Sequence, residues 1–359
     1  MKKMRLGILT WRTKRYVEER TYFTHLAKAA NQLNTDVFLF SPLDLLQSGE
    51  VRCLLYTREK GWIEQRCQPP DVVYDRFRNM QPNAFRTFLR FREQSNWTFL
   101  NSRMAHKWNL HRFLLQNKEL NQWLPETIFL EQSREALQLL KRYDSIYVKP
   151  VNGTGGKGIL SISKRNGAFR LLGRDLQRKV VKKNTTSPLE LTRFITHWTK
   201  KSKYIAQQGL DLEWGTGLIT DFRLLVQKDG DGQWTITGLG GKVGGKNSAT
   251  SNLHGGGKAI QPERFFRQHF SEEKSKAIEA ECEKLGLAVA EYIENKFGRL
   301  LELGIDLGID TAGNVWIIEV NNKPGRDIFK QMGDLDRYRT AVRRPVEYAR
   351  YIYERKGVD

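Results

Sequence analysis

Alternating and periodic hydrophobic positions divide the first hundred residues into strands and helices. Residues 4–10 and 37–40 have strand composition, and apolar residues recur between them at helical spacing. A strand, a helix and a strand at this spacing predict a βαβ unit with parallel strands. Further strands are expected at 72–76 and 98–100, with a helix at 85–91 between them. This segment is therefore predicted to be a small Rossmann-like α/β domain.

Two features of this first domain bear on ligands. No Gly-x-Gly-x-x-Gly sequence follows the first strand, so the sequence does not predict a dinucleotide site there. Asp75 and Arg76 end one strand, and we interpret them as a strand-end salt bridge. Asn101 or Ser102 is expected to cap a helix that runs to about residue 117.

The C-terminal half contains a long amphipathic helix, predicted to begin at Ser271 and to end before Gly298. Its apolar stripe is interpreted as core: Ile278, Cys282, Leu285, Val289 and Ile293. Residues 337–356 predict an exposed, basic terminal helix that Pro345 interrupts. Residues 163–203 are basic and look irregular, so solvated surface is expected there.

A β-hairpin is expected after the long helix, with strands at 303–309 and 315–320. Folding this hairpin about Ala312 and Gly313 brings Asp306 roughly opposite Glu319. Alternation along the second strand puts Glu319 and Asn321 on one face. The opposite face is expected to carry three apolar side chains: Trp316, Ile318 and Val320.

Acidic residues at these hairpin positions predict a metal site. Carboxylates that face each other across a strand pair repel, unless a cation lies between them. Asp306, Glu319 and Asn321 offer only oxygen ligands, which suit Mg²⁺ or Mn²⁺. An ordinary hairpin whose acids face water is the alternative.

A glycine-rich turn joins two further strands near residue 150. Its glycines satisfy Gly-x-Gly-x-x-Gly, but a strand follows instead of the helix that a dinucleotide site requires. The backbone N–H groups of such a turn can bind phosphate oxygens, and Lys149 enters the turn from the preceding strand. A flexible surface hairpin is the alternative. The residues concerned are Gly153, Gly155, Gly156, Lys157 and Gly158.

Asp221 and Arg223 share one face of a predicted strand, where a structural ion pair is the plain interpretation. A planar, permanently charged guanidinium also suits contact with a transferred phosphate. The glycine-rich segment 240–258 follows and is expected to be a loop. It contains Lys242, Asn252 and His254 as candidate phosphate or metal neighbours.

Composition excludes several classes of protein. The chain of 359 residues predicts two or three packed units, and no apolar run approaches the ~20 residues of a membrane span. The apolar stretch at 6–11 is too short for a signal-peptide core. Cys53, Cys67 and Cys282 form no Cys-x-x-Cys pair and predict free thiols in a reducing compartment, so we expect a cytoplasmic protein.

The net charge of +20 predicts an affinity for polyanions. Basic residues look widely spread, and the sequence contains no helix-turn-helix, zinc-finger or RNP pattern. Specific nucleic-acid binding is therefore not expected. An anionic polymer or nucleotide phosphates remain as partners.

Three of these motifs, in this order, resemble the ATP-grasp superfamily over roughly residues 101–326. They are Val-Lys-Pro-x-x-Gly-x-x-Gly-Lys-Gly at 148–158, Asp-Phe-Arg-Leu-Leu-Val at 221–226 and Gly-Ile-Asp-x-x-Gly-Asn-Val-Trp-Ile-Ile-Glu-Val-Asn-x-Lys-Pro-Gly at 308–325. Within the superfamily, the combination is similar to the spore-coat-associated, YheC/YheD-like branch of endospore-forming bacilli. The resemblance implies an N-terminal α/β pre-ATP-grasp domain (1–103), a small lobe (104–206) and a large lobe with the metal site and a basic helical tail (207–359).

The resemblance also implies roles for individual residues. Arg223 would face the transferred phosphate together with Lys242 and Asn252, and Arg326 would point at substrate. Either Asp211 or Glu213 would hold the ribose. ATP would be bound by the glycine-rich flap and five further positions: Lys107, Lys149, the hinge residues Gln207 and Gln208, and Leu210.

The implied function is an ATP- and Mg²⁺-dependent ligase linked to sporulation or the spore coat. A substrate carboxylate would be activated as an acyl-phosphate and captured by an amine or a similar nucleophile. The alternative is a non-catalytic nucleotide-binding or structural spore-coat protein that binds an anionic partner. A nucleic-acid binder comes third.

Overall fold

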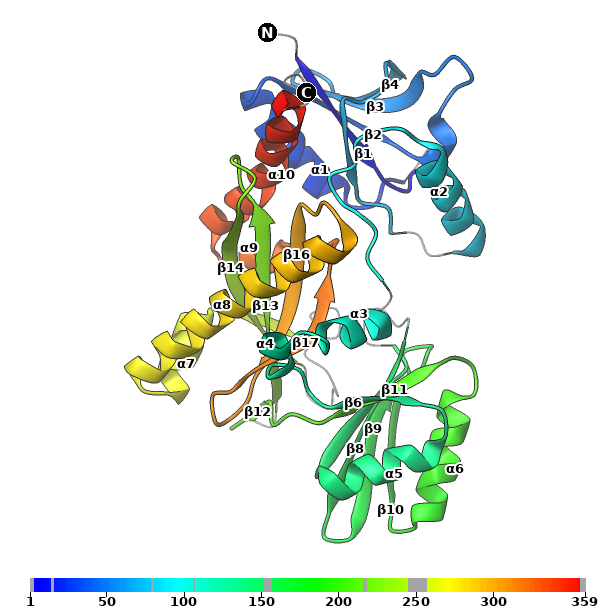
Figure 1. Cartoon of the computed structure of the whole chain (residues 1–359), viewed down its shortest axis with the longest axis vertical. Coiled ribbons are helices and arrows are strands. Elements are labelled where there is room, and N and C mark those ends of the chain that lie inside the picture. Colours follow the sequence, from blue (N-terminus) through cyan, green and yellow to red (C-terminus); the bar gives the residue numbers. More distant parts are fainter. Residues whose placement is uncertain are drawn as a thin grey trace.

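Three β-sheets, one above another, organise the computed structural model (Figure 1). The structure describes these parts of the chain: residues 3–13, 16–78, 81–105, 107–151, 157–215, 218–244 and 257–355. Among the helices described there, none combines the length and apolarity needed to cross a membrane.

The N-terminal domain is built on a five-stranded mixed sheet of order β4-β3-β2-β1-β5. Its elements are β1 (Met4–Leu9), α1 (Arg20–Gln32), β2 (Thr35–Phe40), the 3₁₀ turn η1 (Pro42–Asp44), β3 (Val51–Thr57), β4 (Gly61–Cys67), β5 (Val72–Asp75) and α2 (Pro82–Gln94). The parallel β1–α1–β2 unit is as predicted, and β1 also pairs in parallel with β5. The antiparallel hairpin β3–β4 was not predicted, and Phe99 makes a single bridge to Val73 in place of a strand.

The cysteine prediction is wrong for two of the three residues. Cys53 on β3 and Cys67 on β4 form a disulfide, and only Cys282 is a free, buried thiol. Cys53 is paired with Gln65, two residues before Cys67, so the hairpin brings both side chains to the same face. Sequence spacing alone could not reveal this proximity, because neither strand was expected.

The small lobe is a six-stranded sheet of order β10-β9-β8-β7-β11-β6. Two short helices, α3 (Lys107–Leu114) and α4 (Lys118–Asn121), precede it and pack on the large lobe. The lobe itself contains β6 (Thr127–Leu130), α5 (Ser133–Arg142), β7 (Ser145–Pro150), β8 (Ile159–Arg165), β9 (Ala168–Arg174), β10 (Val180–Thr185), α6 (Pro188–Thr199) and β11 (Tyr204–Gln208). Helices α5 and α6 bury one face of the sheet.

Two predictions for this region are corrected. Residues 163–203 are not irregular, because they form most of three strands and a helix. Lysines and arginines on the exposed positions of these strands hide the apolar alternation. Asn101 does not cap a helix: α3 begins only at Lys107, and the buried Asn101 side chain accepts a hydrogen bond from the Leu301 N–H at 3.0 Å.

The large lobe is a third sheet with the path β15-β14-β13-β16-β17, and β12 pairs with β13 beside it. Its strands are β12 (Glu213–Trp214), β13 (Leu218–Lys228), β14 (Trp234–Val243), β15 (Lys258–Ile260), β16 (Glu302–Ile309) and β17 (Val315–Asn321). Its helices are α7 (Pro262–His269), α8 (Glu272–Phe297), α9 (Asp327–Gln331) and α10 (Leu335–Arg355).

Helix α8 is the long helix predicted from its apolar stripe. The Ser271 side chain accepts a hydrogen bond from the Lys274 N–H at its start, and Gly298 follows its end with a positive φ of 80°. All five stripe residues are buried against β13, β16 and β17. This packing leaves the opposite face of the sheet for other contacts.

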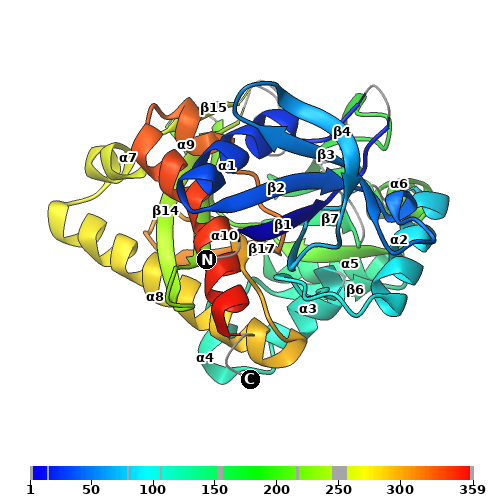
Figure 2. The same ribbon diagram turned by 90° about the horizontal axis from the view of Figure 1, so that it is seen from above.

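Helix α10 corrects the prediction of an exposed, interrupted tail. It is continuous through Pro345, which is itself buried. Its apolar residues share one core with α1 and the N-terminal sheet, so the C-terminal helix lies against the N-terminal domain (Figures 1 and 2). The docked helix joins the first domain to the large lobe.

Candidate active site

Four neighbouring strands of the large lobe bring the predicted charged residues into one row. Strand β13 pairs with both β14 and β16, and β16 pairs with β17. The register aligns Arg223 with Asp306, and Asp306 with Glu319. Asp221 on β13 faces Lys242 on β14. The hairpin pairing predicted for Asp306 and Glu319 is therefore confirmed.

Asp306 is bound by two cationic side chains. Arg223 donates to both carboxylate oxygens, from Nε to Oδ1 at 2.7 Å and from Nη2 to Oδ2 at 2.8 Å. Lys242 Nζ lies 3.0 Å from Asp306 Oδ1 and 2.8 Å from Asp221 Oδ1. The plain interpretation of Asp221 and Arg223 as partners of each other is not what the structure shows, since each has its closest ion pair on another strand.

These pairings fix the charge state of the cluster. Burial alone would raise the pKa of Asp306, but the charges of Arg223 and Lys242 outweigh it and hold that pKa below its usual range. Burial would lower the pKa of Arg223 and of Lys242, yet Asp306 and Asp221 raise both values. Asp306, Arg223 and Lys242 are therefore ionised at neutral pH.

The charge balance around Asp306 bears on the predicted metal site. The charge of Glu319 also raises the pKa of Arg223, so Glu319 lies within electrostatic reach of the same cluster. Arg223 and Lys242 then face three carboxylates (Asp221, Asp306 and Glu319), which leaves one negative charge in excess. No group of three or more His, Cys, Asp or Glu residues suited to a metal occurs in the part of the chain that the structure describes. The predicted set has two carboxylates and the Asn321 amide, and its role stays a prediction.

A β-bulge changes the faces of β17. The register shifts between Asp306 and Leu307, so that Glu319 pairs with Asp306 while Ile317 pairs with Leu307. Strict alternation, which put Trp316 and Ile318 opposite Glu319, therefore fails. Buried core positions on this strand are Val315, Ile317 and Val320.

Lys149 is held in place by its own lobe. It lies on β7, and its Nζ donates to Gln207 Oε1 at 2.6 Å. Gln207 is buried and donates in turn from Nε2 to Thr127 Oγ1 at 3.0 Å. The predicted hinge residue Gln207 therefore orients a lysine from within the sheet.

The hinge after β11 has most of its backbone donors in use. The Gln208 N–H donates to the Glu126 carbonyl at 2.8 Å, and the Gly209 N–H donates to the Ser145 carbonyl at 2.8 Å. Leu210 follows and is half-buried. A purine base that needs a backbone N–H donor would therefore find one in this segment only from about Leu210 onward.

The two candidate ribose acids differ in their surroundings. Asp211 Oδ2 accepts a hydrogen bond from Thr311 Oγ1 at 2.6 Å, and Glu213 lies on β12; both residues are exposed. Neither is excluded by this difference, so the choice stays open.

Several predicted positions lie outside the described residues. These are the flap glycines Gly153, Gly155 and Gly156, together with Asn252 and His254. The side chain of Lys107 at the start of α3 is also outside the description. Lys157 is exposed, and Gly158 has a positive φ of 72°. The Gly158 N–H donates to the Arg174 carbonyl at 2.8 Å, which closes the base of the flap.

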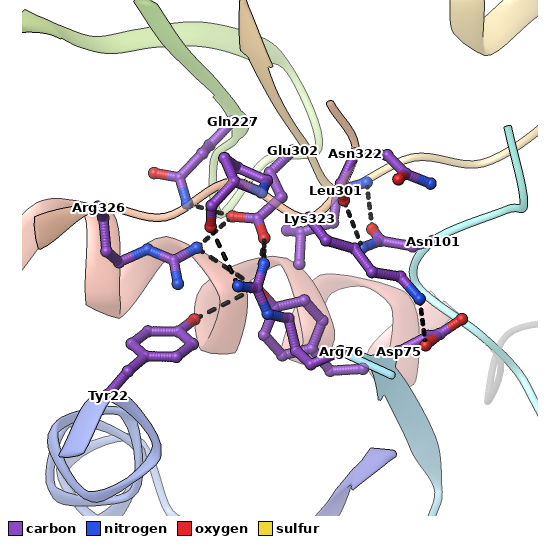
Figure 3. A network of polar contacts seen from close by, with 12 residues as sticks. Tyr22, Asp75, Arg76, Asn101, Gln227, Leu301, Glu302, Asn322, Lys323 and Arg326 are labelled. Atoms are coloured by element: carbon purple, nitrogen blue, oxygen red, sulfur yellow. Dashed lines mark hydrogen bonds and ion pairs between the residues drawn. The ribbon is translucent and has the colours of Figure 1, made fainter. Parts of the chain in front are cut away.

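A buried ionic network beside this site was not predicted (Figure 3). Glu302 at the start of β16 is fully buried, and it binds Arg76 at 3.0 Å and Arg326 at 2.5 Å. Gln227 Nε2 donates a hydrogen bond to Glu302 Oε2 at 3.0 Å, and the Tyr74 hydroxyl donates one to Glu302 Oε1. Glu302 is the first residue of β16, and nothing in the local sequence indicated that it would bind these distant side chains.

The network corrects two predictions. Arg326 does not point at substrate, because it is buried on Glu302 with its guanidinium 3.9 Å from the centre of the Tyr22 ring. Asp75 and Arg76 do not pair with each other. Asp75 binds Lys323 at 2.7 Å, and Arg76 binds Glu19 and Glu302.

The chain is similar to known proteins over most of its length. The model of the YheC/D-like ATP-grasp family matches residues 96–352. The endospore coat-associated protein YheD of Bacillus subtilis (strain 168) is 27% identical over 346 residues, which cover 95% of this chain and 76% of that protein.

Solved structures share the fold at low identity. The VanG D-Ala:D-Ser ligase of Enterococcus faecalis superposes with a TM-score of 0.57 at 13% identity, over 98% of this chain and 100% of that chain. The ATP-grasp ligase PsnB, solved with a phosphomimetic variant of its minimal precursor, Mg and ADP, gives a TM-score of 0.50 at 13% identity, over 94% and 98%.

Proposed function

The chain belongs to the YheC/D-like ATP-grasp family, and from that premise we propose that it is an ATP- and Mg²⁺-dependent ligase. Its reaction would join a substrate carboxylate to an amine or a similar nucleophile. The spore-coat association of YheD supports a role in sporulation or at the spore coat.

One observation carries the proposal: Arg223 and Lys242 are fixed, charged and adjacent to the acidic row Asp306 and Glu319. Fixed cations beside an acidic row suit phosphoryl transfer, because the reaction needs charge stabilisation and positioning more than covalent help from the protein. Asp306, Glu319 and Asn321 would hold Mg²⁺, which neutralises phosphate charge when bound. PsnB, which shares the fold, was solved with Mg and ADP, and this supports the use of Mg²⁺ in general.

The proposed chemistry has two balanced steps. A carboxylate oxygen attacks the γ-phosphorus of ATP, an O–P bond forms, and the bond from that phosphorus to ADP breaks. The amine nitrogen then attacks the acyl carbon, phosphate leaves, and the nitrogen loses a proton. Arg223 would stabilise the charge on the transferred group, with Lys242 and Asn252 beside it.

The small lobe would hold the nucleotide. Lys149, which Gln207 orients at 2.6 Å, would contact phosphate oxygens, as would the flap that Gly158 closes. Lys107, Gln208 and Leu210 complete the proposed nucleotide contacts.

A non-catalytic nucleotide-binding protein is the second candidate. The observation that favours it is that cationic side chains already bind both oxygens of Asp306. In that case the cluster would be a structural ion network, and no product would form.

Thermal denaturation with ATP, with and without Mg²⁺, tests the site. ATP with Mg²⁺ should raise the melting temperature of the wild type by about 2–5 °C at saturating nucleotide. Glu319→Gln should abolish the part of this rise in melting temperature that depends on Mg²⁺. Asp231→Asn is the matched control, because Asp231 is exposed in the β13–β14 turn and the substitution removes the same charge.

The outcomes separate the candidates. A shift that is lost in Glu319→Gln, followed by ADP release with a panel of carboxylates and amines, supports the ligase. The same shift without ADP release in any combination favours the non-catalytic candidate. If ATP and Mg²⁺ leave the melting temperature of the wild type unchanged, both the ligase and the non-catalytic nucleotide-binding protein are contradicted.

A further inference from the structure

More than half of the net charge lies in one short segment. Residues 157–203 contain thirteen lysines and arginines against two acids, Asp175 and Glu190, which gives +11 of the chain's +20. The impression of evenly spread basic residues is therefore wrong. This segment comprises β8, β9, β10 and α6 of the small lobe.

The strand register gathers part of this charge on one face. Leu172 on β9 pairs with Ser161 on β8 and with Lys182 on β10, and Ser161 pairs with Tyr147 on β7. Because side chains alternate, positions two residues apart share a face. The face opposite α5 and α6 consequently carries Lys149, Arg170, Arg174 and Lys182.

The two acids of the segment are already occupied. Glu190 binds Lys183 at 2.5 Å, and Asp175 accepts hydrogen bonds from the backbone N–H groups of Gln177 and Lys179. Arg170 and Lys182 are exposed. Arg174 Nε is shielded from solvent and has no hydrogen-bond partner among the described residues. Arg170 and Lys182 are thus available to an external anion, and Arg174 has a donor that no described residue satisfies.

Protection of an edge strand explains only part of the pattern. Lysines on a sheet edge prevent pairing with other chains, and β10 is such an edge. That reason covers Lys182 and Lys183. It does not cover Arg170 and Arg174, because β9 is hydrogen-bonded on both sides.

The basic face is continuous with the proposed nucleotide site. Three strand spacings of about 4.8 Å separate β7, which carries Lys149, from β10, so the strip is about 14 Å wide. An extended peptide rises about 3.4 Å per residue and would cross it in about four residues. The Arg174 carbonyl also accepts the Gly158 N–H at the base of the flap.

We propose that this face, between Lys149 and β10, binds an acidic polypeptide that carries the carboxylate to be activated. Charge complementarity supports the binding, and only the assignment of that polypeptide as substrate rests on the proposed function. Binding delivers a side-chain or terminal carboxylate to the flap end of the strip.

The side chains favour a polypeptide over a nucleic acid. Single-stranded nucleic acids bind basic grooves in which successive aromatic rings stack on the bases. On the exposed face of β7 to β10 the only aromatic residue among those described is Tyr147; the other uncharged positions are aliphatic or small and polar. Fixed charges without stacking platforms suit closely spaced carboxylates.

Fluorescence anisotropy with labelled poly-L-glutamate of about twenty residues tests the binding on the full chain. Arg170→Gln/Lys182→Gln should weaken binding about fivefold at about 50 mM salt, and the difference should shrink at higher salt. Arg193→Gln/Lys200→Gln is the matched control, because it removes two charges from exposed positions on the α6 side of the same lobe. It should change affinity less than twofold.

Arg174→Gln provides a second variant at the half-buried position, and it should also weaken binding. Equal losses in the sheet-face and α6 double variants would overturn the proposal, since binding would then follow net charge alone. Tighter binding of a single-stranded oligonucleotide of equal charge would overturn it in favour of nucleic acid.

Turnover separates this inference from the proposed function. If poly-L-glutamate with an amine stimulates ADP release, and Arg170→Gln/Lys182→Gln raises its KM without changing kcat, both statements stand. Specific binding without ADP release under any condition leaves the docking face standing and contradicts the ligase. ADP release with a small carboxylate that poly-L-glutamate neither stimulates nor inhibits contradicts the docking inference alone.

Discussion

His111 on α3 is half-buried beside Trp108, with the two ring centres 5.9 Å apart. Its Nε2 is shielded from water and has no hydrogen-bond partner within the described residues. Burial lowers the pKa of His111 to about 4, and the nearby charge of Lys149 adds to the effect. The pKa of His111 thus depends in part on the charge of Lys149, the same lysine that is proposed to bind ATP.

This shift predicts a specific loss of stability in acid. As pH falls below 6.5 the unfolded chain binds a proton that the folded chain refuses, so stability that is complete above pH 6.5 is lost as pH falls towards 4. Between pH 6.5 and 5 the loss should be about 1–2 kcal/mol. Urea midpoints measured at both values should fall less in His111→Gln than in wild type.

A histidine on the surface is the control for that measurement. His197 is exposed on α6, so His197→Gln should retain the full pH dependence of the wild type. An identical slope in wild type and His111→Gln would contradict the assignment.

Residue chemistry was predictable where it followed local periodicity. The facing of Asp306 and Glu319 follows from one hairpin and its turn. The pairing of Arg223 with Asp306 requires two strands that lie 83 positions apart in sequence, and no local pattern sets that register. Arg326 was misassigned for the same reason, since its partner Glu302 gave no sequence signal.

At the scale of elements, the disulfide between β3 and β4 is expected to stabilise the folded protein. The bond between Cys53 and Cys67 closes a loop of 15 residues, for which the chain-entropy relation gives about 3 kcal/mol. Cys53→Ala/Cys67→Ala should therefore lower the thermal midpoint of the oxidised protein. A reductant should lower the wild-type midpoint in the same way and leave the double variant unchanged.

Thiol titration in denaturant checks the bond directly. The oxidised chain should show one reactive thiol, from Cys282, and the reduced chain three. Three thiols in protein that was purified without reductant would restore the original prediction of free cysteines.

The elements that were predicted and those that were missed differ in composition. Helix α8 and the hairpin β16–β17 have strong apolar periodicity because one face of each is buried in a core. Strands β8 to β10 bury one face and expose a basic one, and β10 has the exposed and half-exposed run Val180-Val-Lys-Lys-Asn. Such a strand is specified by its neighbours in the sheet more than by its own residues.

For the whole molecule, Glu302 is a buried ionic link between the N-terminal domain and the large lobe, beside the Asp75–Lys323 pair. It joins Arg76 of the first domain to Arg326 after β17, and all three side chains are at most 2% exposed (Figure 3). Removing one member of a buried ion network leaves the others uncompensated.

Glu302→Gln should therefore destabilise the protein by about 3–5 kcal/mol, because the buried Arg326 loses its acidic partner and the buried Arg76 keeps Glu19 but loses the second of its two acids. Guanidinium denaturation followed by tryptophan fluorescence measures this. Glu263→Gln breaks the more exposed pair with Arg337 (3.0 Å) and should cost about 0–1 kcal/mol. Equal effects of the two substitutions would show that the network carries no special share of the stability.

The sequence by itself determined the elements with strong periodicity, the acidic hairpin and the superfamily, because these depend on short-range spacing of residue types. Only the tertiary structure decided which charges meet: the Arg223–Asp306–Lys242 cluster, the Glu302 network, the disulfide and the basic face of the small lobe. Each joins strands or loops that are distant in sequence or were hidden by surface charge. Their register is set by packing in four hydrophobic cores, and such packing leaves no periodic trace in any single segment.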